Sequence, residues 1–162
     1  MIFRLSQKLN DKIKVGTLAA LPPDENPFAD WSAHIFVADH MQYVLLTNTK
    51  SLYSTVMYAK GITNDSHFIE RALSSIREFM EADGQTFIYQ RFIAPASATV
   101  RFAKALDRSV TGSMNDLAYH ATIWLIEGDL SPLDVGFKLN GIPFSPLQYR
   151  SPMEAFKAML LE

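Results

Sequence analysis

The stretch HIFVADHMQYVLLTNTKSLYSTVMY, residues 34–58, decides the fold class of this chain. It contains three apolar runs, residues 34–38, 43–47 and 52–58, which are rich in the β-branched and aromatic residues typical of strands. Two short polar turns separate the runs, and short turns keep consecutive strands adjacent in a sheet. The stretch therefore predicts an antiparallel β-meander.

Two long helices are predicted after these strands. Residues 66–82 carry apolar side chains at i, i+3, i+4 and i+7 spacing, with Asp65 or Ser66 as N-cap and Gly84 just beyond the C-terminus. Residues 109–127 are apolar almost all round, which is typical of a central helix covered on most sides.

Shorter elements complete the prediction. They are a strand at 2–5, a helix capped by Ser6 and running to Ile13, an irregular segment at 17–30, a strand at 99–104, a helix at 133–139 and a final helix begun by Ser151-Pro152 with Glu154. Periodicity allows either helix or strand for residues 86–93. The predicted fold class is α+β: an antiparallel β-meander packed against two long helices plus shorter helices, in a single domain of residues 1–162.

Composition narrows the classes of function. Fifteen basic and seventeen acidic residues leave a net charge of -2, so no net positive field favours nucleic acid or an anionic membrane. The absence of cysteine excludes disulfides, thiolate metal sites and thiol catalysis. The start of the sequence lacks the pattern of a secretory signal, and no apolar run is long enough to span a bilayer. We expect a soluble cytoplasmic protein, and no motif predicts a cofactor or a metal site.

The densest run of polar side chains is DRSVTGSMND, residues 107–116, at the start of the second long helix. One interpretation is structural, with Asp107 or Ser109 as the N-cap of that helix. The other is a small anion-recognition site formed by Arg108, Ser109 and the positive end of the helix, with Asn115 nearby.

Asp116 and His120 are four residues apart and so share one face of the predicted helix. Such a pair could orient a histidine for acid–base chemistry or supply two metal ligands, with His34 or Asp39 as a third. A buried Asp–His hydrogen bond is the more ordinary role, and it is the one we expect.

A third group, Trp31 and His34, lies where the proline-rich segment meets the first strand of the predicted meander. Trp31 is expected to anchor the segment to the core, whereas His34 either faces a pocket or lies at the end of the strand. A ligand site here would lie where this segment meets the start of the second long helix.

Five short segments carry a family resemblance. They are IFRL at 2–5, NPF at 26–28, DW at 30–31, RSVTGSMND at 108–116 and SPL at 145–147. Over nearly its whole length the chain resembles a bacterial family of domains of unknown function. More remotely it is similar to a segment of plasmid-encoded open-reading-frame proteins. The resemblance implies a helix at residues 86–93 and a strand at 99–104, and it implies no activity.

Three functions remain as hypotheses. The preferred one is a small-ligand or protein-binding module that uses Trp31, His34, Arg108, Ser109 and Asn115. The second is an enzyme, hydrolase or nuclease-like, with Asp116 and His120 as catalytic residues. The third is a structural subunit that self-associates as a homo-oligomer through a sheet edge or the last helix.

Overall fold

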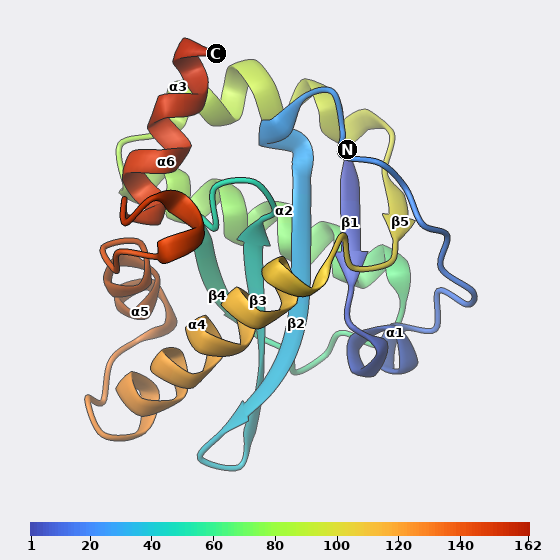
Figure 1. The fold of residues 1–162 in the computed structure, drawn as a ribbon. Helices are drawn as coiled ribbons and strands as arrows, with labels where there is room; N and C mark the ends of the chain where they lie inside the picture. The colour runs from blue at the N-terminus through green and yellow to red at the C-terminus, as the bar shows by residue number, and fades with distance from the viewer.

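The computed structural model describes residues 1–162, which form five strands and six α-helices with short helical turns between them (Figure 1). The strands are β1 (Ile2–Leu5), β2 (Asp30–Ala38), β3 (Met41–Asn48), β4 (Ser54–Tyr58) and β5 (Arg101–Ala103). The α-helices are α1 (Gln7–Ile13), α2 (Asp65–Ala82), α3 (Thr86–Ile88), α4 (Arg108–Ile126), α5 (Pro132–Leu139) and α6 (Pro152–Ala158). Short 3-10 turns at Pro27–Ala29, Pro95–Ala98, Ser145–Leu147 and Met159–Leu161, and a π-helix at Tyr89–Ile93, complete the list.

All five strands form one sheet in the order β4-β3-β2-β1-β5. Strands β2, β3 and β4 pair antiparallel, with Ala33 opposite Leu46 and Leu46 opposite Thr55. Strand β1 instead pairs parallel with both β2 and β5. Parallel neighbours need a long crossover connection, and residues 6–29 supply it between β1 and β2. The predicted mixture of helices and strands in one domain is confirmed.

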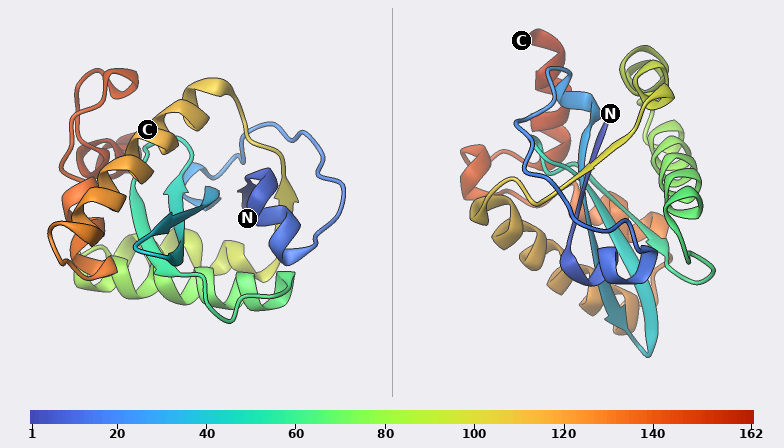
Figure 2. Two further views of the ribbon diagram at one scale, coloured as in Figure 1. Left: turned by 90° about the horizontal axis from the view of Figure 1, so that it is seen from below. Right: turned by 90° about the vertical axis from the view of Figure 1, so that its right-hand side faces the viewer.

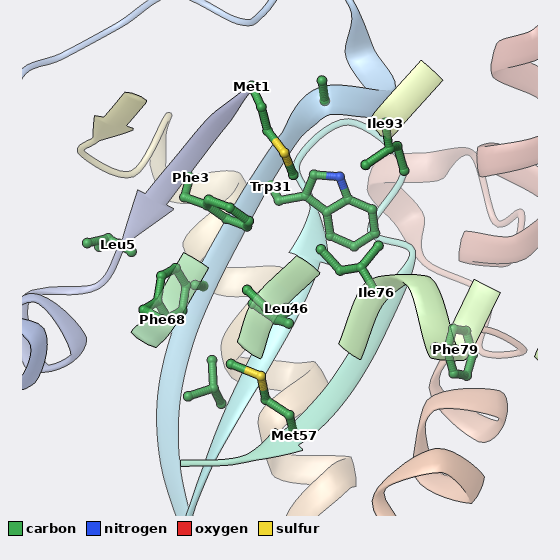
Figure 3. Packing of buried hydrophobic residues seen from close by; sticks show 14 of the residues in the cluster. Met1, Phe3, Leu5, Trp31, Leu46, Met57, Phe68, Ile76, Phe79 and Ile93 are labelled. Carbon is green, nitrogen blue, oxygen red and sulfur yellow. The ribbon is translucent and has the colours of Figure 1, made fainter. Parts of the chain in front are cut away.

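The sheet is the middle of three layers, with α2 on one face and α4 and α5 on the other (Figure 2). The core on the α2 side contains 26 buried residues, and the core on the α4 side contains 15. Successive residues of a strand point to opposite faces, so Trp31, Ala33 and Ile35 enter the first core while Phe36 and Ala38 enter the second. Figure 3 shows Trp31 packed in the first core with Met1 and Ile76.

Helix α2 matches its predicted range, but the predicted N-cap is wrong. Asn64 caps the helix, because its side-chain oxygen accepts a hydrogen bond from the His67 N–H at 2.9 Å. Gly84 follows the helix with a φ of +74°, as expected for the residue that ends a helix in the left-handed region. The capping box predicted at Ser151 and Glu154 is present at the start of α6.

Helix α4 differs from its prediction as a central helix covered on most sides. It lies in an outer layer and buries one side against the sheet, including Met114, Leu117 and Ala121. Tyr119 is 66% exposed and Ile126 is 50% exposed. The prediction was wrong because a layer that packs on one face of a sheet is covered on one side only, however apolar its sequence.

The remaining predictions concern segments before and after α4. Residues 86–93 are helical, through α3 and the π-helix that follows it, and the predicted strand at 99–104 is the shorter β5. Asp107, one of the two residues expected to cap α4, is its N-cap. None of the helices is both long enough and apolar enough to cross a membrane.

Candidate functional site: a cavity at the carboxyl ends of the parallel strands

A cavity of about 730 Å³ opens beyond the carboxyl ends of the parallel strands β1 and β5. Its volume is typical of small-molecule sites, which measure about 300–1,000 Å³. Open sheets with parallel strands bind ligands in this position, because the chain turns away from the sheet there and leaves a crevice. The lining residues are Leu5, Ser6, Gln7, Asn10, Gly16, Thr17, Leu18, Ser32, Ala33, His34, Lys104, Ala105, Val110, Thr111, Met114 and Asn115.

Five parts of the chain build this cavity. The middle of β2 forms the floor, and α1 and the loop at residues 16–18 form one wall. Residues 104–105, which follow β5, and the start of α4 form another. The Asn10 side chain holds the loop in place, because its amide donates to the Gly16 carbonyl at 2.7 Å and its oxygen accepts from the Val15 N–H. Gly16 has a φ of +102°, a conformation that favours glycine.

His34 lies on the floor of the cavity and also lines a neighbouring cavity of about 650 Å³. Its half-buried imidazole makes no hydrogen bond within the chain. Burial lowers the pKa of His34 below its usual 6.5, and the nearby Lys8 ammonium lowers it further. The ring is therefore neutral at pH 7, with one N–H donor and one nitrogen acceptor free for a ligand.

A buried ion pair between Arg4 and Asp30 lies on the same face of the sheet as Ser32 and His34. The Arg4 guanidinium donates through Nε and Nη2 to both carboxylate oxygens of Asp30, at 2.9 and 2.8 Å. The same guanidinium donates to the Leu21 and Pro22 carbonyls, which fixes the proline-rich segment against the sheet. This geometry is the bidentate arrangement that makes Arg–carboxylate pairs strong.

A chain of hydroxyl groups connects this ion pair to the cavity. The Thr49 hydroxyl donates to Asp30 Oδ1 at 2.8 Å, and the Ser32 and Thr49 hydroxyl oxygens are 2.8 Å apart. Because the single proton of Thr49 is used on Asp30, Ser32 must donate its own proton to Thr49. Ser32 lines the cavity, so its hydroxyl can only accept a hydrogen bond from a ligand.

The structure brings together part of the ligand set expected from the sequence. His34 and Asn115 both line the cavity, although β2 and α4 are far apart in the sequence. Arg108 and Ser109 are exposed on the first turn of α4, outside the lining. Trp31 is completely buried on the opposite face of the sheet and lines none of the cavities described here. The middle of β2 and the start of α4 therefore meet at this cavity, through His34 and Asn115.

Asp116 and His120 do not join this group. Asp116 is exposed and makes no side-chain hydrogen bond, so the expected buried Asp–His hydrogen bond is wrong. The His120 ring instead stacks on Trp124, with ring centroids 5.6 Å apart. No cluster of three or more His, Asp or Glu side chains in the structure is arranged to hold a metal ion.

Sequence reasoning missed several lining residues, including Ser32, Lys104 and Thr111. Ser32 could have been predicted from the sequence. Residues two apart in a strand share a face, and His34 was already a candidate. Thr111 lies within the polar run at residues 107–116 that the sequence singled out, although it was not named as a ligand contact. Lys104 carries no local signal, since it meets β2 only through the tertiary fold.

The lowered pKa of His34 predicts a pH dependence of stability. The unfolded chain binds a proton to this histidine at a higher pH than the folded chain, so stability falls as the pH falls through about 6.5. We expect His34→Gln to flatten the decrease in the free energy of unfolding between about pH 7.5 and 5.5. Urea denaturation at several pH values measures this. His67→Gln, which removes an exposed histidine on α2, is the control, and parallel curves for His34→Gln and the unmodified protein would contradict the assignment.

Comparisons with known proteins identify a family but no activity. A family model described as a domain of unknown function (DUF6933) matches residues 2–155. Searches of curated proteins and of solved structures found no match. The cavity is therefore the starting point for assigning a function.

Proposed function

Because the chain belongs to the DUF6933 family, whose description states no activity, we propose a function from its site: it binds a small organic molecule in the cavity beside His34. The observation that carries the proposal is the His34 imidazole, which lies on the cavity floor with both of its nitrogens unpaired within the chain. A bound ligand would supply the missing partner.

The lining has the composition expected of such a site. Leu18, Val110 and Met114 offer apolar contact, and a few polar groups, including His34 and Asn115, converge on the same space. Ligand sites are mostly apolar, with a small number of polar groups that set orientation. The walls are also held in place before binding, because Asn10 fixes the loop at residues 16–18 and Arg4 donates to the Lys104 carbonyl. A preorganised site loses less entropy when it binds.

Binding is favoured over nucleophilic catalysis by the direction of the hydrogen bonds. An activated serine needs a base within hydrogen-bond distance of its hydroxyl proton. The Ser32 proton is donated to Thr49, and His34 has no partner that would orient it as a base. The arrangement supports recognition of a ligand more directly than a reaction.

We propose further that the protein works in the cytoplasm. The support is the absence of cysteine, because small exported domains commonly depend on disulfides. The net charge of -2 gives no electrostatic attraction for a nucleic acid.

A thermal-shift screen against a library of metabolites tests the binding proposal. A compound present at a hundred times its Kd stabilises the folded protein by about 2.7 kcal/mol, which raises the melting temperature by several degrees. We expect each stabilising compound to lose its effect on Thr111→Trp, because this change places a large side chain at the cavity wall. Ser109→Trp puts the same side chain two residues away, outside the lining, and is expected to retain the effect.

Replacement of His34 by glutamine is the second arm of the same experiment. Loss of one hydrogen bond to a ligand is expected to weaken its binding about three- to tenfold. Isothermal titration of a compound from the screen measures the change in Kd. Equal binding by Thr111→Trp and the unmodified protein would show that the ligand lies elsewhere and would overturn the proposal.

A further inference from the structure

We propose that the ligand of this cavity is an anion, a small molecule with a carboxylate or phosphate group, and that Lys104 binds that group. The inference rests on the binding function proposed above and adds the chemical class of the ligand. Its starting point is the charge of the lining: among the sixteen residues there is no aspartate or glutamate, and Lys104 is the one residue with a permanent charge.

Lys104 is an unpaired cation held at a fixed place. The ion pairs of the structure do not include it, so its ammonium group has no acidic partner within the chain. Its backbone is fixed on both sides, because its N–H donates to the Ala19 carbonyl and its carbonyl accepts from the Arg4 guanidinium. The side chain therefore starts from an ordered position at the cavity and remains free to contact a ligand.

Three aspartates near the cavity accept hydrogen bonds, and only Asp30 among them is paired with a cation. Both oxygens of Asp30 accept hydrogen bonds from Arg4, and Asp107 accepts from the Val110 N–H as the cap of α4. On α1, the Asp11 carboxylate accepts from the Gln7 side chain at 2.8 Å. A second cation, Lys8, lines the neighbouring cavity that shares His34. Within the lining itself Lys104 is the only formal charge, so a ligand bound there would meet one cation and no carboxylate.

Other lining residues constrain the rest of the ligand. Ser32 can only accept a hydrogen bond, as derived above, so the ligand is expected to present a hydroxyl or amino group there. Leu18, Val110 and Met114 provide apolar contact for its carbon skeleton. The ligand class that fits is a small organic acid that also carries a hydrogen-bond donor.

The affinities of two fluorescent probes, one anionic and one neutral, test whether the cavity selects an anion. 1-Anilinonaphthalene-8-sulfonate carries an anionic group, and N-phenyl-1-naphthylamine has the same aromatic body without it. We expect Lys104→Gln to weaken the anionic probe about tenfold or more, because a hydrogen bond to a charged group is lost. The neutral probe is expected to keep its Kd within about twofold, and raised salt should weaken only the anionic probe. Lys104→Arg retains the charge and is expected to restore most of the affinity.

Two further variants separate the failure of this inference from the failure of the proposed function. Lys60→Gln removes an exposed lysine far from the lining and is expected to change neither Kd. Thr111→Trp is expected to block both probes. If Thr111→Trp blocks both probes but Lys104→Gln weakens them equally or not at all, the cavity binds ligands without selecting anions, and this inference is overturned. If neither probe binds, or if Thr111→Trp blocks neither, the proposed function itself fails.

Discussion

Replacement of Arg4 by methionine is expected to lower the free energy of unfolding by about 3–5 kcal/mol, because it leaves the Asp30 carboxylate buried without its partner charge. The side chains of Arg4 and Asp30 are only 1% and 4% exposed, so water cannot replace the lost contacts. The Leu21 and Pro22 carbonyls lose their donor in the same variant. Urea denaturation at pH 7 measures the change.

The control for this variant is an ion pair on the surface. Arg77 and Glu81 form an exposed pair one turn apart on α2, and Arg77→Met is expected to cost much less than Arg4→Met, because water screens the pair. The double variant Arg4→Met, Asp30→Leu removes both buried charges and is expected to recover part of the stability lost by Arg4→Met alone. A loss of similar size for Arg4→Met and Arg77→Met would contradict the role given to the buried pair.

The change Trp31→Ala is also expected to cost about 3–5 kcal/mol, the range for removing a large aromatic side chain from a core. The indole is completely buried, and its N–H donates to the Phe28 carbonyl at 2.8 Å. Its ring also contacts Tyr53 and Phe156 edge to face. Chemical denaturation measures the loss. Trp124→Ala, on half-buried Trp124 of α4, is the matched control and is expected to cost less.

This variant also distinguishes a core role from a ligand role for Trp31. Below the melting temperature of Trp31→Ala, we expect its affinity for a cavity ligand to stay within about threefold of the unmodified protein, because indirect effects of a distant core change are usually small. A large loss of affinity in a fully folded Trp31→Ala protein would place Trp31 in the site and contradict the geometry described here.

The fate of Trp31 and His34 shows why the site was predicted only in part. They were grouped because they are neighbours in sequence, with the strand expected to begin at residue 34. Strand β2 begins at Asp30 and includes both residues, which are an odd number apart and so face opposite sides of the sheet. His34 therefore reaches the cavity, and Trp31 enters the core with α2.

The sequence by itself determined the local structure of this protein. The apolar spacing of α2, the Ser151 capping box and the strand composition of residues 34–58 act over a few residues, so they can be read without the fold. Only the tertiary structure decided that β1 lies between two parallel neighbours, that α4 is covered on one side, and that His34, Ser32 and Lys104 share a cavity. These features depend on contacts between distant segments. Such contacts produce no pattern in the sequence of either segment alone, so they cannot be predicted from it.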